Sequence, residues 1–319
     1  MDLRLFVSLS YICTLGIYIF MTAIEFKAKI AGGCLSLVGH LPLRVLYGIG
    51  DFAAWFMRRV LHYRENVVLT NISRAFPKMW YDDVRRLADA YYSRIGELFA
   101  ETIWFGGCNG NGAKLRKQKI YEYTNPELLL KYHAQRGVMS MKSHCGNWEL
   151  FGGIYDYCES FRGTLDMDDV YVAYRAMHSP VSDKVFYENR RAPLPGFKGL
   201  VEDTKLMRHA VARKDARPVY ILNADQYPYK ACHPVGTFLN QDTQGMLGGF
   251  SLASKLGFAV LYMREERVCR GHYRLTFEVI SENALGQDPE KLMRQYYDLL
   301  EADIVKDPVN WLWSHKRWH

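Results

Sequence analysis

The spacing of apolar residues switches along the chain between the period of a helix and the period of a strand. Residues 65–76 and 81–105 carry helical apolar spacing on either side of Pro77, which predicts two helices. Strands are predicted at 137–142, 170–174, 218–222, 259–263 and 273–280. Further helices are predicted at 201–211, 249–256 and 289–303. This alternation predicts an α/β fold with a mixed central sheet wrapped by helices.

The first 60 residues are apolar enough to meet a membrane. Residues 3–24 carry a single charge, Arg4, and match the ~20 residues that a bilayer-spanning helix needs. Lys27 and Lys29 follow, so a spanning helix would place its carboxyl-terminal side in the cytoplasm. A cleavable signal peptide is the alternative, although no small-x-small cleavage site is evident. A second apolar stretch, 34–57, could span, re-enter or lie flat. We therefore expect a membrane anchor with interfacial helices at 1–60 and one further domain at 61–319.

The amino-acid composition indicates which kinds of binding partner and cofactor to expect. A formal net charge of +7 suits an anionic membrane surface, phosphorylated substrates or an acidic carrier protein. No zinc-finger spacing or RNA-binding strand motif is present, so nucleic acid is not an expected partner. The seven cysteines are scattered and include no C-x-x-C, which favours reduced thiols over a disulfide framework. The histidines show no metal-ligand spacing, and we expect no metal or cofactor.

The segment His144-Cys145-Gly146-Asn147-Trp148-Glu149 is the strongest chemical signal. It follows a predicted buried strand, and Asn147 is a good N-cap for a helix that begins at Trp148. Gly146 loosens the turn, so the His144 ring could fold back towards Glu149. In such a pair the carboxylate fixes the tautomer of the imidazole, which then accepts a proton at its other nitrogen. A structural or surface pair is the plainer interpretation of this spacing.

Other polar residues also follow predicted strands. Arg175 comes after 170–174, and Asp225 and Gln226 come after 218–222. Open α/β sheets build their sites at the carboxyl ends of strands, so these residues are candidates for binding. A structural ion pair for Arg175 and a loop-capping role for Asp225 are the alternatives. The chain closes on His315, Lys316 and Arg317 among tryptophans, which suggests a basic rim on a membrane or on acceptor phosphates.

Several of these segments resemble one enzyme family. Residues 143–149 match the H-x-G-N-W-E block of the late lauroyl/myristoyl transferases of lipid A synthesis, within the lysophospholipid-acyltransferase-like group. The segments 63–71 and 75–77, together with 174–175 and 224–226, resemble other blocks of that family. The segments 238–243 and 311–318 resemble Bacteroidetes-type members. After Thr243 and after Gln226 the sequence departs from the usual pattern, which bears on acceptor or acyl-chain preference more than on reaction type.

The resemblance implies an O-acyltransferase at the cytoplasmic face of the inner membrane. It would act as a monomer and transfer a fatty acyl group from an acyl carrier protein thioester to a hydroxyl of a glycolipid, the lipid A precursor. His144 and Glu149 would form the catalytic dyad. Asn147 would contact the substrate, and backbone N–H groups near it would stabilise the oxyanion. Arg175 would serve the oxyanion or a glycolipid phosphate, and Asp225 and Gln226 would orient the sugar or support Arg175.

Two other functions are compatible with the same sequence. The acceptor could be an aminolipid or another envelope lipid, because fold does not fix substrate. The chain could also be a membrane scaffold that has kept the fold without the reaction.

Overall fold

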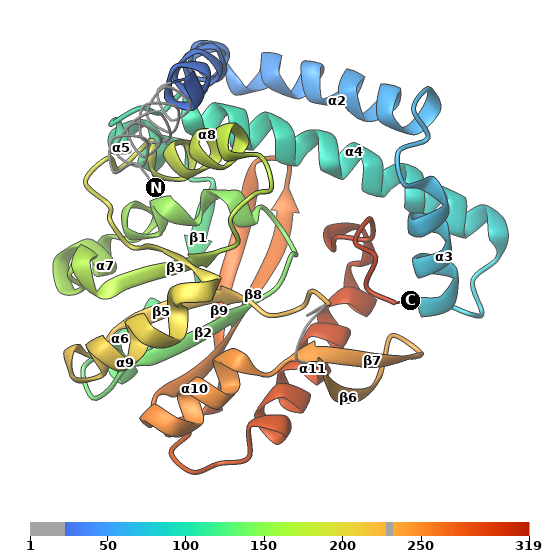
Figure 1. Ribbon diagram of the computed structural model, residues 1–319. Helices are drawn as coiled ribbons and strands as arrows, with labels where there is room; N and C mark the ends of the chain where they lie inside the picture. The colour runs from blue at the N-terminus through green and yellow to red at the C-terminus, as the bar shows by residue number, and fades with distance from the viewer. Residues whose placement is uncertain (1–22, 228–231, 319) are drawn as a thin grey trace, which may run out of the picture.

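A computed structural model describes residues 23–227 and 232–318 of the 319-residue chain (Figure 1). Its centre is a seven-stranded sheet in the order β1-β9-β8-β2-β5-β3-β4. The strands are β1 Tyr121–Tyr123, β2 Val138–Lys142, β3 Val170–Tyr174, β4 Leu200–Glu202, β5 Val219–Asn223, β8 Ala259–Cys269 and β9 His272–Ser281. All neighbours pair in parallel except β8 and β9, which form an antiparallel hairpin. The expected mixed sheet wrapped by helices is confirmed.

Alternate residues of the central strands feed two cores, one on each face of the sheet. In β2, Met139 and Met141 face one core while Val138 faces the other. Helices α3, α4, α10 and α11 contribute to the first core, and α2, α5, α6, α7 and the 3-10 helix η1 contribute to the second. The helices are α2 Leu43–Arg59, α3 Glu65–Ala75, α4 Tyr81–Gly106, α5 Gly112–Gln118, α6 Pro126–His133, η1 Trp148–Tyr157, α7 Glu159–Thr164, α8 Pro180–Arg191, α10 Gly248–Leu256 and α11 Pro289–Lys306.

The predicted strands and most of the predicted helices are present, but 201–211 is wrong in part, and β1, α5, α6, α7 and α8 were not predicted. The segment 201–211 does not begin as a helix: β4 occupies its start, a short 3-10 turn Asp203–Lys205 follows, and α9 covers Leu206–Arg213. A separate antiparallel hairpin, β6 Cys232–Phe238 and β7 Gln241–Met246, lies beside α11 and was not anticipated. Its polar residues and its Pro234 and Gly236 hide the period of a strand.

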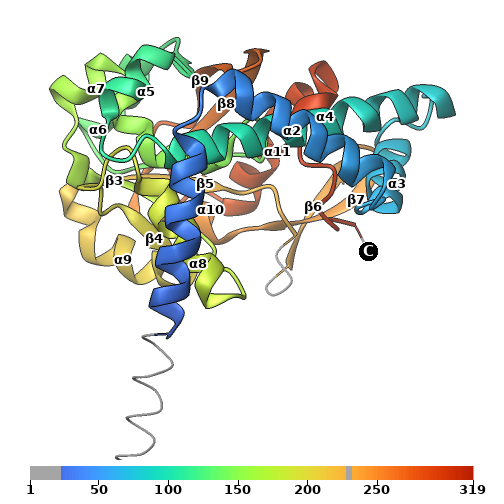
Figure 2. The same ribbon diagram turned by 90° about the horizontal axis from the view of Figure 1, so that it is seen from above.

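Two helices form the amino-terminal part of the described chain. Ala23–Gly39 runs beside α8, where Lys184 Nζ pairs with Glu25, and the chain then turns by 115° into α2 (Figure 2). Helix α2 packs along α4 because Gly50 and Gly96 let the two backbones touch; a Cβ on Gly50 would lie 2.3 Å from the Gly96 carbonyl oxygen. The second apolar stretch of the sequence therefore becomes α2 and the end of the helix before it.

Within residues 23–227 and 232–318, no single helix is both long and apolar enough to cross a bilayer. The bent pair Ala23–Gly39 and Leu43–Arg59 passes the same test of length and composition when its two halves are taken together. The predicted spanning segment, 3–24, lies almost wholly outside the described residues.

Candidate active site

His144 and Asp225 meet because their strands are parallel neighbours. Strand β2 pairs with β5 so that Lys142 lies opposite Asn223, the last residue of each strand. Two residues further on, His144 and Asp225 emerge at the same edge of the sheet. The Asp225 carboxylate accepts two hydrogen bonds from His144: Oδ1 lies 2.6 Å from Nδ1, and Oδ2 lies 2.9 Å from the backbone nitrogen.

This contact defines the chemical state of the imidazole. In the neutral tautomer whose Nδ1–H donates to Asp225, Nε2 carries the lone pair and can accept a proton. Nε2 lies 3.0 Å from Nε2 of Gln226 and 3.5 Å from Nδ2 of Asn223, so side-chain amides surround it. The ring of Trp148 packs edge-on against the imidazole at 4.9 Å between centroids. The Nδ1 side of the ring is thus held by Asp225, and the Nε2 side faces the two amides.

Asp225 is fully buried but is held as a carboxylate. Burial alone would favour the neutral acid, but the charge of His144 and the hydrogen bonds from His144 and Trp311 outweigh it and lower the pKa of Asp225 well below its ordinary value. Asp225 is therefore an anionic hydrogen-bond partner for the His144 ring.

Glu149 has a different partner from the one expected. Its carboxylate accepts a fork of hydrogen bonds from Arg190 of α8, at 2.8 Å from Nε and 3.2 Å from Nη2. The structure thus corrects the expected His144–Glu149 pairing: the carboxylate on His144 is that of Asp225. The reason is sheet register, which brings β5 beside β2, while η1 carries Glu149 towards α8. A part for Glu149 in the chemistry stays a prediction.

The turn after His144 is fixed by contacts to its backbone. Gly146 adopts φ +64°, and a Cβ there would fall 1.7 Å from Oε1 of Glu265, so glycine is required on both counts. The amide of Gly146 donates to Asn310, and the amide of Asn147 donates to Glu265 at 2.8 Å. These two N–H groups therefore already have partners, and an oxyanion role for the backbone N–H groups near Asn147 stays a prediction.

Asn147 is confirmed as the N-cap, although the helix it begins is a 3-10 helix. Its side-chain oxygen accepts from the amide of Glu149, and its Nδ2 donates to the Leu98 carbonyl and to Oε2 of Glu101 in α4. The side chain is 1% exposed and uses these bonds to hold the turn against α4. Its position favours a structural role over the predicted substrate contact.

A buried ion pair lies beneath the same turn. Lys142, the last residue of β2, bonds through Nζ to Oε2 of Glu265, and Tyr121 donates to Oε1 of the same carboxylate at 2.6 Å. The Lys142 ammonium also lies 4.0 Å from the centre of the Phe151 ring. Glu265 therefore joins strands β1, β2 and β8 to the amide of Asn147.

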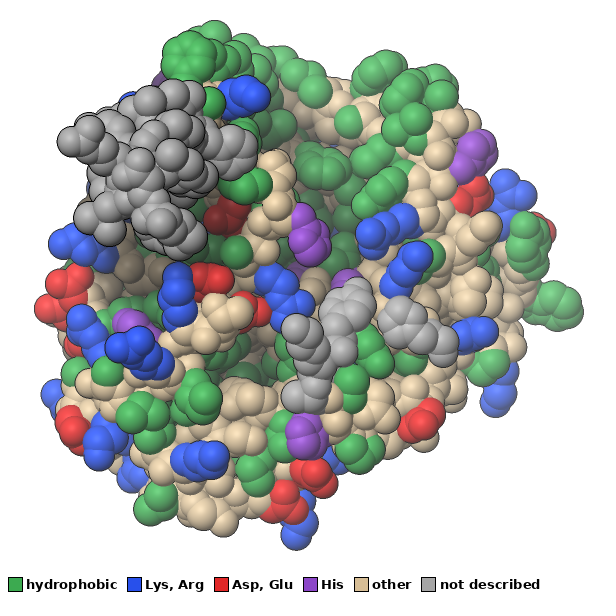
Figure 3. All heavy atoms as spheres, in the orientation of Figure 1, with side chains coloured by type: hydrophobic (Ala, Val, Ile, Leu, Met, Phe, Trp, Pro, Cys, Tyr) green, Lys and Arg blue, Asp and Glu red, His purple; other side chains and the backbone are tan. Residues whose placement is uncertain are grey.

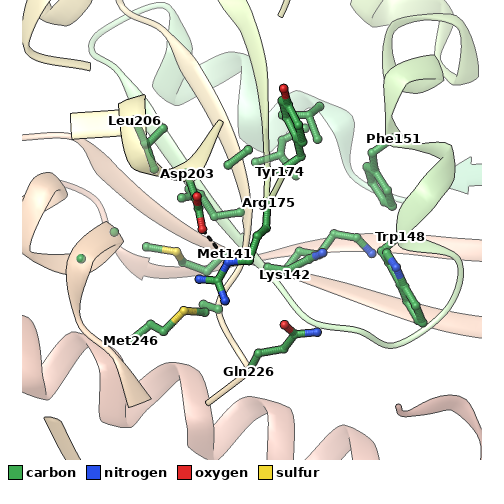
Figure 4. A pocket seen from close by; sticks show the side chains of 18 of the residues that line it. Met141, Lys142, Trp148, Phe151, Tyr174, Arg175, Asp203, Leu206, Gln226 and Met246 are labelled. Atoms are coloured by element: carbon green, nitrogen blue, oxygen red, sulfur yellow. Dashed lines mark hydrogen bonds and ion pairs between the residues drawn. The ribbon is translucent and has the colours of Figure 1, made fainter. Parts of the chain in front are cut away.

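A cavity of about 590 Å³ opens beside His144. Figure 4 shows Arg175 and Gln226 between Met141, Met246 and Leu206 on one side and Trp148 and Phe151 on the other. In Figure 3 the hollow contains hydrophobic side chains, with lysine and arginine side chains near its rim. The cavity can hold an apolar chain with a polar group at the His144 end.

The remaining predicted site residues divide between this cavity and its surroundings. Gln226 lines the cavity beside His144, as the sequence suggested for a binding residue. Arg175 also lines it, is 53% exposed, and donates through Nε to Asp203 at 2.8 Å. Both sequence-based interpretations of Arg175, an ion pair and a binding group, are therefore compatible with its place. Cys145 is buried, and burial raises the pKa of its thiol, which fits a packing role.

The carboxyl-terminal segment is not the basic rim that was expected. Arg317 is 2% exposed, and its guanidinium donates to the carbonyls of Asp225 and Gln244. Burial lowers the pKa of His315 to about 4, so this ring is neutral at physiological pH. Trp311 and Trp313 are buried in the core, and among the described residues 311–318 only Lys316 is exposed.

With this geometry in place, a family comparison decides the class of protein. A model of the family described as bacterial lipid A biosynthesis acyltransferase matches residues 21–319. The chain belongs to this family. A search of curated proteins found no match. Membership in this family makes the protein an acyltransferase of lipid A biosynthesis. It confirms the family resemblance inferred from the H-x-G-N-W-E block. The Bacteroidetes-type assignment stays a prediction.

Four residues of the acyltransferase site were missed by sequence reasoning. Lys142 and Glu265 look like ordinary charges in the sequence, although a lysine that ends a short, mostly apolar strand is a signal of a buried partner. Arg190 and Trp311 reach the site from distant segments and carry no local signal. Among the described residues, no group of three His, Cys, Asp or Glu side chains could hold a metal ion.

Proposed function

We propose that this acyltransferase moves a fatty acyl group from an acyl carrier protein thioester to a hydroxyl of a lipid A precursor, with His144 as the general base and Asp225 as its partner. The observation that carries the proposal is the orientation of His144. Its Nδ1 is held by Asp225, and its Nε2 faces the amides at the wall of an apolar cavity.

The reaction follows from this orientation in two steps. As the acceptor hydroxyl attacks the thioester carbonyl carbon, its proton passes to Nε2 of His144, and Asp225 stabilises the imidazolium. The tetrahedral intermediate then expels the thiolate, which takes the proton back from Nε2 and leaves as the free thiol. The products are an ester and the carrier thiol, and no covalent enzyme intermediate is needed.

The oxyanion of that intermediate needs donors other than the turn amides. The side-chain amides of Gln226 and Asn223 lie nearest to Nε2 and can turn towards a carbonyl oxygen placed there. The amides of Gly146 and Asn147 are bonded to Asn310 and Glu265, which favours these side-chain donors in their place.

The cavity matches the two chemical parts of the substrates. Its apolar wall, which includes Met141, Leu206 and Leu252, suits a fatty acyl chain. Arg175, Arg190 and Lys255 also line it and suit the phosphates of a glycolipid or of a phosphopantetheine arm. Glu149 fits this scheme as the residue that holds the Arg190 guanidinium in place.

The exposed surface of α2 supports a location of the protein at the cytoplasmic face of the inner membrane. Val45, Ile49, Phe52 and Phe56 form an exposed stripe along this helix, and Phe52 is 65% exposed. Arg44 and Arg59 stand exposed at its two ends, where they can meet lipid phosphates. An exposed apolar stripe of this kind fits a helix that lies in the membrane interface.

Mass spectrometry of envelope lipids tests the proposal. Cells that lack the protein should lose one acyl chain from lipid A, and His144→Ala and Asp225→Asn should fail to restore it while still being expressed. A change confined to aminolipids would move the acceptor to another envelope lipid, and unchanged lipids would favour a scaffold.

The same assay separates the two carboxylates. Glu149→Gln should retain more activity than Asp225→Asn, because the amide oxygen of glutamine can still accept one bond from Arg190. If Glu149→Gln were inactive and Asp225→Asn active, the dyad would be His144 with Glu149 instead.

A further inference from the structure

The carboxyl-terminal segment closes over the far side of the Asp225 carboxylate. Nε1 of Trp311 donates to Oδ2 of Asp225 at 2.8 Å, and the indole is buried. Nη1 of Arg317 donates to the backbone carbonyl of the same aspartate. Residues far apart in the sequence thus hold both the side chain and the main chain of Asp225.

The two oxygens of Asp225 have separate partners. Oδ2 accepts from Trp311 and from the His144 amide, while Oδ1 accepts from Nδ1 of the imidazole. Two donors on Oδ2 stop the carboxylate from rotating about its own axis. Oδ1 therefore stays aligned with Nδ1–H of the imidazole during the proton transfers. A carboxylate that rotated away would leave Nδ1–H without its acceptor.

The segment that carries Trp311 is itself firmly placed. Asn71 of α3 donates to the carbonyls of Trp313 and His315, and Tyr91 of α4 donates to Ser314. Figure 1 shows the end of the chain beside α3. The guanidinium of Arg317 lies within reach of the rings of Phe238, Tyr297 and Trp318, and its Nη2 donates to Tyr297 at 2.7 Å.

We propose that Trp311 is a positioning residue of the acyltransferase, which acts through Asp225 to orient His144, and that Arg317 fixes the main chain at the same point. This inference rests on the proposed function, because it assumes that the His144–Asp225 pair performs the proton transfer. It assigns a role in the reaction to the last eight described residues of the chain.

Two tryptophans of the same segment provide a matched pair of variants. Trp311→Phe removes the donor to Asp225 and keeps a ring in the core. Trp313→Phe removes an equally buried indole whose Nε1 donates instead to the Pro308 carbonyl, away from Asp225. Both substitutions leave a similar gap, so they should lower the thermal unfolding temperature by similar amounts.

The measurement is steady-state kinetics of the full-length protein with an acyl carrier protein thioester and a lipid A precursor. Trp311→Phe should lower kcat by roughly 10-fold with KM unchanged, the size expected when a hydrogen bond to a charged group is lost. Trp313→Phe should keep kcat within about 2-fold of the wild type, since neither oxygen of Asp225 loses a partner. Equal kcat values for the two variants would overturn the inference.

Different results would reject the proposed function and the role of Trp311. If Asp225→Asn keeps full activity, the pair is not the base and the premise falls. If Asp225→Asn is inactive while Trp311→Phe has the kcat of Trp313→Phe, the premise stands and only the role of Trp311 is lost. Arg317→Lys, which keeps the charge but not the fork, should lower kcat less than Trp311→Phe and again leave KM unchanged.

Discussion

Two buried carboxylates lie on opposite sides of the His144–Asn147 turn and have opposite properties. Asp225 meets the turn on the cavity side, and its pKa is lowered. Glu101 of α4 meets it from beneath, through Nδ2 of Asn147, and burial raises its pKa. Both are fully enclosed, so burial alone does not decide the charge of either one.

The difference lies in the donors. Asp225 faces His144, which can carry charge, and it accepts three well-placed hydrogen bonds. Glu101 accepts from the neutral groups of Asn147, Tyr47 and Tyr273, and the attraction of Arg94 does not offset its burial. On the Asp225 side of the turn the environment stabilises a charged carboxylate. On the Glu101 side the neutral acid is favoured, and its hydrogen bonds fix the conformation of the turn.

The largest effect on activity should come from replacing Asp225. Asp225→Asn should lower kcat by about 10²- to 10⁴-fold, the usual contribution of a general base, because the imidazolium loses its partner and the tautomer is no longer fixed. Single-turnover kinetics with an acyl carrier protein thioester measures this. Unchanged binding of the thioester is the control, and a loss confined to KM would contradict the assignment.

The buried ion pair beneath the turn gives the next effect, on stability. Lys142→Met should lower the free energy of unfolding by about 3–5 kcal/mol, because Glu265 would keep a buried charge without its partner. Chemical denaturation of the purified protein measures the change. The double variant with Glu265→Gln should recover part of the loss. A double variant less stable than Lys142→Met would show that the pair does not act as a unit.

The sequence predicts the elements of this fold better than their contacts. The strand 170–174 and the helices around 65–76 and 81–105 were found from periodicity, because each buries an apolar face. The edge strand β4 was missed because three residues are too few to show a period. Hairpin β6–β7 was missed for its polar composition.

The candidate site shows the same limit more sharply. His144 and Asp225 were both recognised at strand ends, but only the strand order places β5 beside β2, and no local pattern carries that order. Glu149 was preferred because it lies near in sequence. Trp311 was taken for a membrane residue, since a buried indole and an interfacial one look alike in sequence.

The pH dependence of stability should separate the two carboxylates. The lowered pKa of Asp225 contributes stability above its ordinary value of 3.8, and this contribution is lost as the pH falls through the folded pKa. The raised pKa of Glu101 works in reverse: its contribution is present below 4.5 and is lost as the pH rises through the folded pKa. Denaturation at a series of pH values should show a shallower acid loss in Asp225→Asn and a shallower loss above pH 4.5 in Glu101→Gln. Parallel curves for the two variants would contradict the opposite shifts.

The smallest effect should come from Glu101→Gln at neutral pH. Glutamine has the shape of the neutral acid: its oxygen can accept from Asn147 and Tyr273, and its NH2 can donate to the Tyr47 oxygen. We therefore expect kcat within about 3-fold of the wild type and a stability change of about 1 kcal/mol. Glu101→Ala is the contrasting variant: it leaves one N–H of the Asn147 side-chain amide and two buried tyrosine hydroxyls without their acceptor, and it should destabilise the turn by more. Kinetics and denaturation of both variants measure this difference. If Glu101→Gln instead lost activity as Asp225→Asn does, Glu101 would have to carry a charge in the reaction, and the division between the two sides of the turn would be wrong.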